Sequence, residues 1–373
     1  MRMTISNAGL NPLDQTKQIK EVKKSRHTRL NIGAWRDGGF GDAFFSYAVL
    51  KAIKRKFPES TIEFLTPQGT FSEVFKHQDF CIHRQSTYRE IYQIQRSCLN
   101  VFDIFYCLRP STFSVINWKK IKHTDYFNQL KNSATNQKNF FGDYWEVNPE
   151  KAAGGKVWGN GAIQAIDGFN HIHCLDSNFD DAKESIENSR AFKEFENSKV
   201  FQELKNQKFV TFHQWGFVGH GTWTTKFWPY EKWQELAKKI KKELGIRIIQ
   251  IGGKNEIAMN GEIENFLDKN NFLESCRLIQ EAQIHVDVEG SLIHAAALLN
   301  EPAIALTGPT GKYWRHEEKE CVDYIFSKPR CEIQPCEFSH GGSWNWGCPL
   351  SNHICMNEIS VEQVFEKILE RLK

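Results

Sequence analysis

Short apolar runs alternate with amphipathic segments along the first half of the chain. Residues Leu30–Trp35 predict a strand that runs into glycines, and Asp42–Phe57 carries apolar residues at helical spacing before Pro58 stops the pattern. Residues 61–65 predict a second strand, and residues 101–108 predict a further buried one. Because crossovers between parallel strands are right-handed, this strand–helix–strand unit predicts a parallel sheet.

The same alternation restarts after a charged stretch at residues 188–208. Strands are predicted at 209–212, 246–251, 284–288 and 303–307, and helices at 231–244, 291–299 and 361–372. The middle of the chain, from about residue 120 to 190, is rich in Asn, Lys, Gly and aromatic residues and predicts loops and short helices. Two such halves imply two doubly wound α/β domains that face each other across a cleft.

Length and composition place the chain among ordinary globular proteins. It has 373 residues, of which 40% are hydrophobic and 25% charged, and this length predicts two domains. We place them at residues 29–195 and 196–373, after a polar, basic arm at residues 1–28. The net charge of +3 is too small to indicate a nucleic-acid partner.

The sequence also bears on membrane association. No apolar run reaches the roughly 18 residues of a membrane span, and the first residues lack the continuous apolar stretch of a signal peptide. These features predict a cytoplasmic protein. The basic arm fits two interpretations, a tail without function and a segment attracted to an anionic membrane surface. Membrane association is therefore at most peripheral in this prediction.

The glycine-rich turn after the first strand is the first candidate site. Residues Gly38 to Asp42 read Gly-Gly-Phe-Gly-Asp, and glycines at this place let a ligand approach the backbone closely. Asp42 starts a helix at the carboxyl edge of the predicted sheet, where open α/β sheets bind ligands. Asp42 fits two roles here, a helix cap and a catalytic carboxylate.

Two segments of the second half have features of phosphate-binding sites. Lys226 precedes a predicted helix, where a lysine can hold phosphate as a mobile point charge. The hydroxyls beside it, which could donate to the same oxygens, belong to Thr222, Thr224 and Thr225. Gly290 and Ser291 open a helix of small residues, whose free N–H groups and dipole favour an anion. The alternative for Lys226 is a solvated lysine in a surface loop.

Two further side chains lie close to these segments in the sequence. Glu256 follows a strand that ends in Gly252-Gly253, and a carboxylate at this place can bind a ribose diol. A solvated carboxylate is the alternative. His294 lies in the helix that Gly290 opens, and it fits either a ligand contact or a packed core histidine.

Four of the ten cysteines cluster near the end of the chain, at Cys331, Cys336, Cys348 and Cys355. Without an export signal, a local cysteine cluster favours a metal over disulfides. Four thiolates within 25 residues can close a tetrahedral structural site, and His340 and His353 are alternative ligands. Zinc and iron are both compatible with this set, and buried or free thiols without a metal are the alternative.

In their order along the chain, these motifs resemble glycosyltransferase family nine, whose members use ADP-heptose. The matching segments are GDAFFSYAVLKAIKRKFP from Gly41, Lys226-Phe227-Trp228-Pro229 with Trp233, Gly252-Gly253 with Glu256, and Asp287 to His294 with Gly308-Pro309-Thr310. The resemblance covers roughly residues 29–110 and 209–371. One extra residue separates Gly290 from His294, and Glu289 precedes the glycine. This version resembles the adhesin-modifying branch of the family.

The resemblance implies a GT-B fold, in which two doubly wound α/β domains face a central cleft, and an inverting sugar transfer that requires no cofactor for catalysis. It implies that Asp42 is the general base, that Lys226 and the helix start at Gly290-Ser291 bind the donor diphosphate, and that Glu256 binds the ribose. The other residues that it implies at the nucleotide sugar are Gly41, Thr222, Thr224, Thr225, Asp287, Glu289 and His294.

The resemblance also implies the partners of the chain. The donor would be ADP-heptose, and the acceptor a lipopolysaccharide core, another surface glycan or a protein hydroxyl. Members of the adhesin-modifying branch carry a four-cysteine iron site in this part of the chain, which the cysteine cluster resembles. The alternative function is a non-catalytic nucleotide-binding scaffold, with an interaction module built from the cysteine segment and Lys328, Arg330, Trp344 and Trp346. The intact Gly41-Asp42 pair argues against that alternative.

Overall fold

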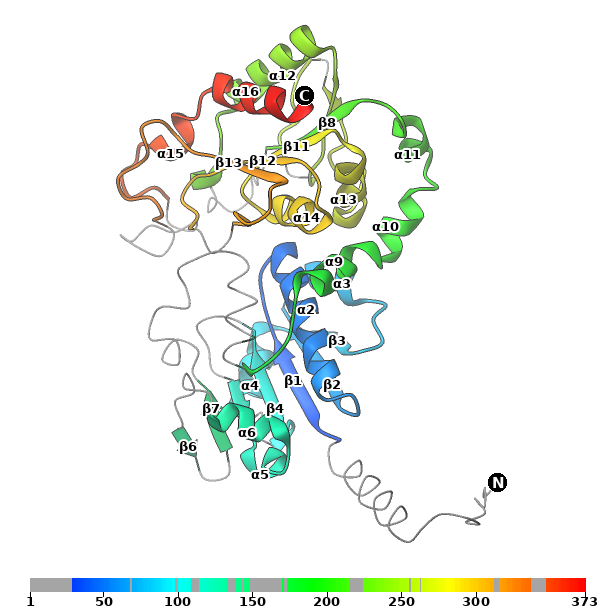
Figure 1. Cartoon of the computed structure of the whole chain (residues 1–373), viewed down its shortest axis with the longest axis vertical. Helices are drawn as coiled ribbons and strands as arrows, with labels where there is room; N and C mark the ends of the chain where they lie inside the picture. Colours follow the sequence, from blue (N-terminus) through cyan, green and yellow to red (C-terminus); the bar gives the residue numbers. More distant parts are fainter. Residues whose placement is uncertain are drawn as a thin grey trace.

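The structure is a computed structural model with two sheets. It describes residues 29–67, 69–97, 100–108, 114–132, 139–141, 144–147, 170, 173–214, 224–254, 256–261, 263–311, 315–336 and 347–373. The two sheets lie one above the other along the long axis, the first built from the first half of the chain and the second from the second half (Figure 1). The basic arm at residues 1–28, Thr222, His340, Trp344 and Trp346 lie outside the described residues.

The first sheet has seven strands in the order β3-β2-β1-β4-β5-β7-β6. Their bounds are β1 Asn31–Trp35, β2 Thr61–Thr66, β3 Ile82–Gln85, β4 Ile104–Cys107, β5 Ser114–Ile116, β6 Asn139–Phe141 and β7 Tyr144–Val147. Strands β1 to β4 pair in parallel, as the sequence predicted, whereas β5, β7 and β6 pair antiparallel. The prediction of loops and short helices alone for the middle of the chain was therefore wrong for β6 and β7. Strands of three or four residues are too short to show a periodic pattern.

The second sheet has six parallel strands in the order β10-β9-β8-β11-β12-β13. Their bounds are β8 Phe209–His213, β9 Arg247–Gln250, β10 Glu264–Asn265, β11 Ile284–Val288, β12 Ala303–Leu306 and β13 Val322–Ile325. The chain leaves β8 toward β9 on one side and returns to β11 on the other. The strand order therefore reverses between β8 and β11, and ligands of such sheets bind at this point, outside the carboxyl ends of the strands.

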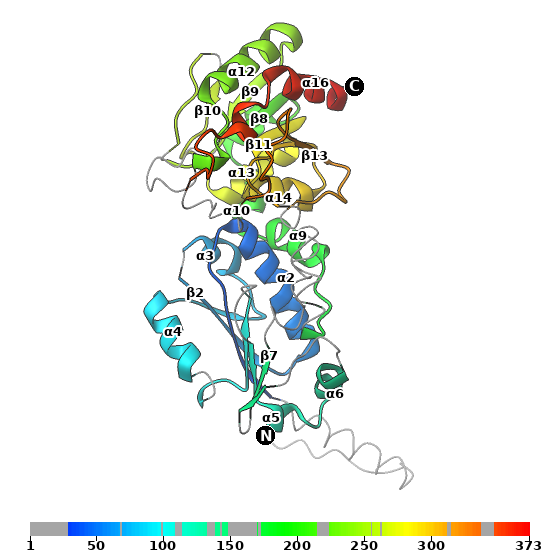
Figure 2. The ribbon, with the colours of Figure 1, turned by 90° about the vertical axis from the view of Figure 1, so that its left-hand side faces the viewer.

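Helices cover both faces of each sheet. Figure 2 shows α2 and α4 on opposite faces of the first sheet. The helices of the first half are α2 (Phe40–Lys56), α3 (Thr70–Phe75), α4 (Tyr88–Ser97), α5 (Trp118–Ile121) and α6 (Asp125–Asn132). In the second half they are α12 (Tyr230–Leu244), α13 (Phe272–Glu281), α14 (Ser291–Leu299), α15 (Ile354–Asn357) and α16 (Val361–Leu372), with the short helix η2 (Thr224–Lys226). Across the described ranges, the structure has no helix of the length and apolar character needed to cross a membrane.

One apolar core runs through both halves. Ile32 and Ala34 of β1 and the buried face of α2 share a cluster of packed side chains with α13 and α14 of the second half. Between them lie the connecting helices α9 (Phe179–Glu187), α10 (Arg190–Phe195) and α11 (Lys199–Leu204). Helix α9 packs on α2 and α14, and α10 packs on α13, so the linker helices complete the interface.

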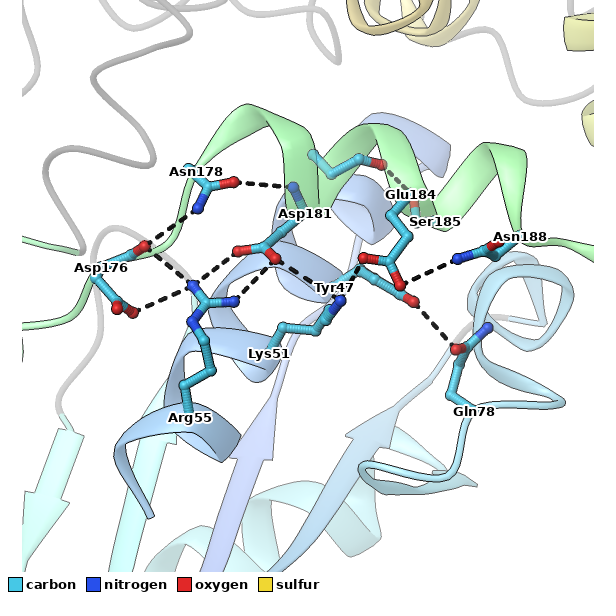
Figure 3. A network of polar contacts seen from close by, with 11 residues as sticks. Tyr47, Lys51, Arg55, Gln78, Asp176, Asn178, Asp181, Glu184, Ser185 and Asn188 are labelled. Atoms are coloured by element: carbon cyan, nitrogen blue, oxygen red, sulfur yellow. Dashed lines mark hydrogen bonds and ion pairs between the residues drawn. The ribbon is translucent and has the colours of Figure 1, made fainter. Parts of the chain in front are cut away.

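Ion pairs fasten α9 to α2 (Figure 3). Arg55 holds both carboxylate oxygens of Asp181 at 2.8 Å and also reaches Asp176 at 3.2 Å. Lys51, one turn earlier on α2, pairs with Glu184 and lies 3.8 Å from Asp181. The Asp181 side chain is only 9% exposed, and a bidentate guanidinium is the partner that best satisfies a buried carboxylate. We refer to these five residues as the α2–α9 brace.

Candidate active site

Asp42 lies in the first turn of α2, where its carboxylate is held by two neighbours. Its Oδ2 accepts a hydrogen bond from the backbone N–H of Gly39, the N-cap residue of the helix, at 2.9 Å. Its Oδ1 is paired with the guanidinium of Arg36, which also donates to the carbonyl of Leu108 beyond the end of β4. The cap that the sequence left as one interpretation is therefore present. The side chain remains 22% exposed, so its oxygens are also accessible from outside.

Gly38 shapes the turn that carries Asp42. Its φ of 124° is a conformation that side chains other than glycine rarely adopt. A Cβ at this position would lie 2.0 Å from Oδ2 of Asp42. The glycine turn thus permits the Asp42 carboxylate to fold back over the backbone.

The start of α2 meets the start of α14 at the contact between the two halves (Figure 1). The backbone N–H of Gly41 donates to Oγ of Ser291 at 3.3 Å. A Cβ on Gly41 would lie 2.7 Å from the ring of His294, so no side chain fits there. The rings of Phe40 and Phe272 stack beside this contact with their centroids 3.7 Å apart. The structure therefore brings Gly41 close to Ser291 and His294, although Gly41 and Ser291 are 250 residues apart in the sequence.

Lys226 forms a buried ion pair directly before α14. Its Nζ lies 2.7 Å from Oε2 of Glu289 and donates to the Glu289 carbonyl at 3.2 Å. Both side chains are less than 10% exposed, so Lys226 is not the solvated surface lysine of the alternative interpretation. Burial acts to raise the pKa of Glu289, but the ion pair with Lys226 holds it below its ordinary value. A buried ion pair therefore lies at the predicted diphosphate site.

His294 is paired with a residue that the sequence analysis missed. Its Nδ1 lies 2.8 Å from Nε2 of His316, and both rings are buried. Burial, followed by the influence of His316, lowers the pKa of His294 to about 4. His294 is therefore neutral at physiological pH. His316 lies six residues after Thr310 of the Gly-Pro-Thr motif, and only the fold shows that it reaches His294.

Glu256 is held by a second histidine that the sequence analysis missed. His213, the last residue of β8, contacts Oε1 of Glu256 at 3.1 Å and Oδ1 of Asp287 at 2.8 Å. Burial would lower the pKa of His213, but the two carboxylates raise it well above its ordinary value. Glu256 also accepts a hydrogen bond from the N–H of Gly253 at 2.7 Å. Glu256 and Asp287 are thus bridged by an imidazolium. The end position of His213 on the strand beside the reversal of strand order is the signal that could have revealed it.

The remaining predicted residues lie around these contacts. Thr225 is buried in η2, and Thr224 begins that helix. Gly290 adopts an extended conformation as the N-cap of α14, whose first N–H groups follow it. The structure therefore places Thr225, Lys226, Glu289, Gly290, Ser291 and His294 at one helix start, next to Gly41 and Asp42 of the first half.

The four cysteines form one neighbourhood, and the N–H of Cys336 donates to the carbonyl of Pro309 at 3.2 Å. Burial, followed by the electrostatic influence of Cys331, Cys336 and Cys348, raises the pKa of the Cys355 thiol to about 12. None of these four cysteines is in a disulfide. Within the part of the chain that the structure describes, no three His, Cys, Asp or Glu side chains are arranged to hold a metal ion.

Comparison with known proteins finds a family match for part of the chain. Residues 169–316 match the family model of glycosyltransferase family 9 (heptosyltransferase). Lipopolysaccharide heptosyltransferase 1 of Pseudomonas aeruginosa is 30% identical over 133 residues, which cover 32% of this chain and 38% of that protein. The chain thus matches less than half of the length of this curated relative.

Solved structures share the whole fold. A glycosyl transferase of family 9 from Veillonella parvula has a TM-score of 0.55 at 15% identity, over 93% of this chain and 98% of that one. The iron-containing dodecameric glycosyltransferase TibC of enterotoxigenic E. coli, also solved with ADP-D-beta-D-heptose, has a TM-score of 0.53 at 14% identity, over 92% and 77%. These likenesses confirm the predicted two-domain GT-B architecture, and residues 169–316 of the chain are similar to glycosyltransferase family 9.

Proposed function

We propose that this chain is an inverting glycosyltransferase that transfers heptose from ADP-heptose to a hydroxyl acceptor. The main support is the meeting of two helix starts, one carrying Asp42 and the other carrying Ser291 beside the Lys226–Glu289 pair. A carboxylate on one side and an anion-binding helix start on the other are the two parts that a sugar transfer from a nucleotide diphosphate requires. The family match of residues 169–316 supports the same chemistry.

In this proposal the acceptor hydroxyl approaches from the first half, and the carboxylate of Asp42 removes its proton as the oxygen attacks the anomeric carbon. Arg36 and the Gly39 N–H keep that carboxylate oriented. Negative charge develops on the departing diphosphate in an oxocarbenium-like transition state. Lys226 and the first N–H groups of α14 stabilise this charge, so the reaction requires no catalytic metal.

Glu256 lies where the proposal needs a partner for the ribose. The His213 imidazolium fixes one of its oxygens, Oε1, at 3.1 Å. The other, Oε2, has no hydrogen-bond partner among the residues that the structure describes, although it is buried. A ribose hydroxyl could donate to Oε2, and such a bond would satisfy a buried polar atom that otherwise costs free energy.

The acceptor and the location are the finer parts of the proposal. We propose a surface glycan, a lipopolysaccharide core or a protein hydroxyl as acceptor, and activity in the cytoplasm with at most peripheral membrane contact. A nucleic-acid partner is not proposed, because the net charge is only +3. The rival function, a non-catalytic scaffold, would bind the nucleotide sugar without consuming it.

A donor screen tests the proposal. Purified full-length chain is incubated with ADP-heptose, ADP-glucose, UDP-glucose and GDP-mannose, and nucleoside diphosphate release is measured with and without candidate acceptors. We expect release from ADP-heptose above the other donors. Binding of ADP-heptose without any turnover in the presence of core saccharide, glycan and protein acceptors would favour the scaffold.

We also propose that the four cysteines from Cys331 to Cys355 bind one structural ion, zinc or iron. Their thiols influence one another electrostatically, and four thiolates suit either metal. Elemental analysis should find about one equivalent of metal per chain, and Cys348→Ser should lower the melting temperature without changing ADP affinity, because a closed site contributes folding free energy. Metal-free protein with an unchanged melting temperature would exclude the ion.

A further inference from the structure

Two imidazoles in direct contact connect the proposed diphosphate site to the outer part of the second half. Nδ1 of His294 and Nε2 of His316 are 2.8 Å apart, so one nitrogen donates and the other accepts. The outer nitrogens face carboxylates. Nε2 of His294 lies 3.7 Å from Oε1 of Glu289, and Nδ1 of His316 lies 3.7 Å from Oε1 of Glu318.

The carboxylate of Glu289 decides where the proton of His294 lies. Nε2 of His294 is best served by an N–H, because a lone pair there would face a negative oxygen. Burial lowers the pKa of His294, so its ring is neutral and carries only this one proton. Nδ1 of His294 is then the acceptor, and the Nε2–H of His316 donates to it.

The surroundings of the pair agree with this arrangement. Lys226 of η2 lowers the pKa of His294, whereas Asp42 of α2 raises it. Glu289, which follows β11, also raises it. Glu318 is ionised, since His316 lowers its pKa against the effect of burial. Two aromatic side chains, Phe45 of α2 and Phe179 of α9, also pack against the rings.

We propose that His316 is a positioning residue that holds His294 in the neutral Nε2–H tautomer, so that a hydrogen-bond donor faces Glu289 and the start of α2 at Gly41, where the proposed diphosphate would bind. The proposal rests on the proposed function for the identity of that ligand. The geometry of the pair does not depend on it. Without His316, the proton of His294 could occupy Nδ1. The lone pair of Nε2 would then face the carboxylate of Glu289 and the bound diphosphate.

Two substitutions separate this role from a packing role. His316→Gln places an amide N–H where the Nε2–H of the imidazole lies, whereas His316→Phe keeps a ring and removes the donor. Full-length protein labelled with ¹⁵N-histidine reports the tautomer by NMR, with His294→Gln used for assignment. We expect the Nε2–H pattern in the wild type and in His316→Gln between pH 6 and 8, and a mixture or the Nδ1–H pattern in His316→Phe.

Calorimetry with ADP provides the second readout. His316→Phe should weaken ADP binding about fivefold, the size of one neutral hydrogen bond, and His316→Gln should stay within about twofold. A wild-type His294 with its proton on Nδ1 would overturn the proposal, as would a folded His316→Phe variant identical to the wild type in both readouts. If His316→Phe does not fold, the tautomer of His294 in the wild type alone tests the proposal. Absence of ADP binding to the wild type would instead count against the proposed function, because the tautomer is measured without ligand.

Discussion

Asp42→Asn should abolish at least about 99% of turnover while the protein stays folded. A positioned general base contributes typically 10²–10⁴-fold in rate, and asparagine cannot accept the proton of the acceptor hydroxyl. Asparagine can still accept the hydrogen bond from the Gly39 N–H, and it caps helices nearly as well as aspartate. The variant loses the ion pair with Arg36, so we expect a small drop in melting temperature. Turnover with ADP-heptose and unfolding by circular dichroism measure the two effects.

Two other aspartates serve as comparisons for Asp42. Asp37 also lies beyond the carboxyl end of β1, where it accepts a hydrogen bond from the hydroxyl of Tyr88 at 3.2 Å, so Asp37→Asn tests the local rival. Asp103 accepts a hydrogen bond from the N–H of Asn31, at the amino end of β1, which is the wrong edge of the sheet for a ligand. Asp103→Asn should therefore retain turnover. Substantial transfer by Asp42→Asn, with loss in Asp37→Asn, would move the general base to Asp37.

Lys226→Ala should weaken ADP binding by roughly 10–150-fold, which corresponds to the 1.5–3 kcal/mol of a hydrogen bond to a charged group. The structure adds a second effect. The substitution leaves the carboxylate of Glu289 buried without its cation, and breaking a buried pair from one side typically costs about 3–5 kcal/mol of stability. Calorimetry measures the first effect, and urea unfolding measures the second.

A double variant separates the two effects of Lys226. Lys226→Ala combined with Glu289→Gln removes the unpaired charge, so it should recover most of the lost stability. It should not recover ADP affinity, because the ammonium that binds phosphate is still missing. If the double variant regained both, the role of Lys226 would be to neutralise Glu289 rather than to bind the diphosphate.

Regular elements of the fold were predictable from the sequence because each combines a strong pattern with a clear boundary. Strand β11 and helix α14 have the predicted residues, 284–288 and 291–299, since Gly290 separates an apolar run from a run of small helix formers. Strands β6 and β7 were missed. They add to the sheet edge by antiparallel pairing of three or four residues, and no local pattern of that length distinguishes a strand from a loop.

The candidate site residues could be proposed from the sequence, whereas the side chains that contact them could not. Asp42 and Glu256 follow strand ends, where position alone suggests ligand contact, and Lys226 precedes a helix. Arg36, His213 and His316 contact these residues or their neighbours through the fold, over sequence separations of 6, 43 and 22 residues. The ionisation of the site depends on these partners. Its charge pattern therefore required the tertiary structure.

Gly41 is hydrogen bonded to Ser291 across the two halves, so a diphosphate that bonds to the Ser291 hydroxyl would compete with this contact and favour a separation of the halves. The α2–α9 brace makes α9 travel with the first half, while α10 remains packed on α13 of the second. A rotation of the halves must then be absorbed by Asn188 and Ser189, the two residues between these helices. Opening would be a rigid-body rotation about a two-residue hinge, during which α9 slides along α14. The ion pairs of the brace would determine that the hinge lies after α9 rather than before it.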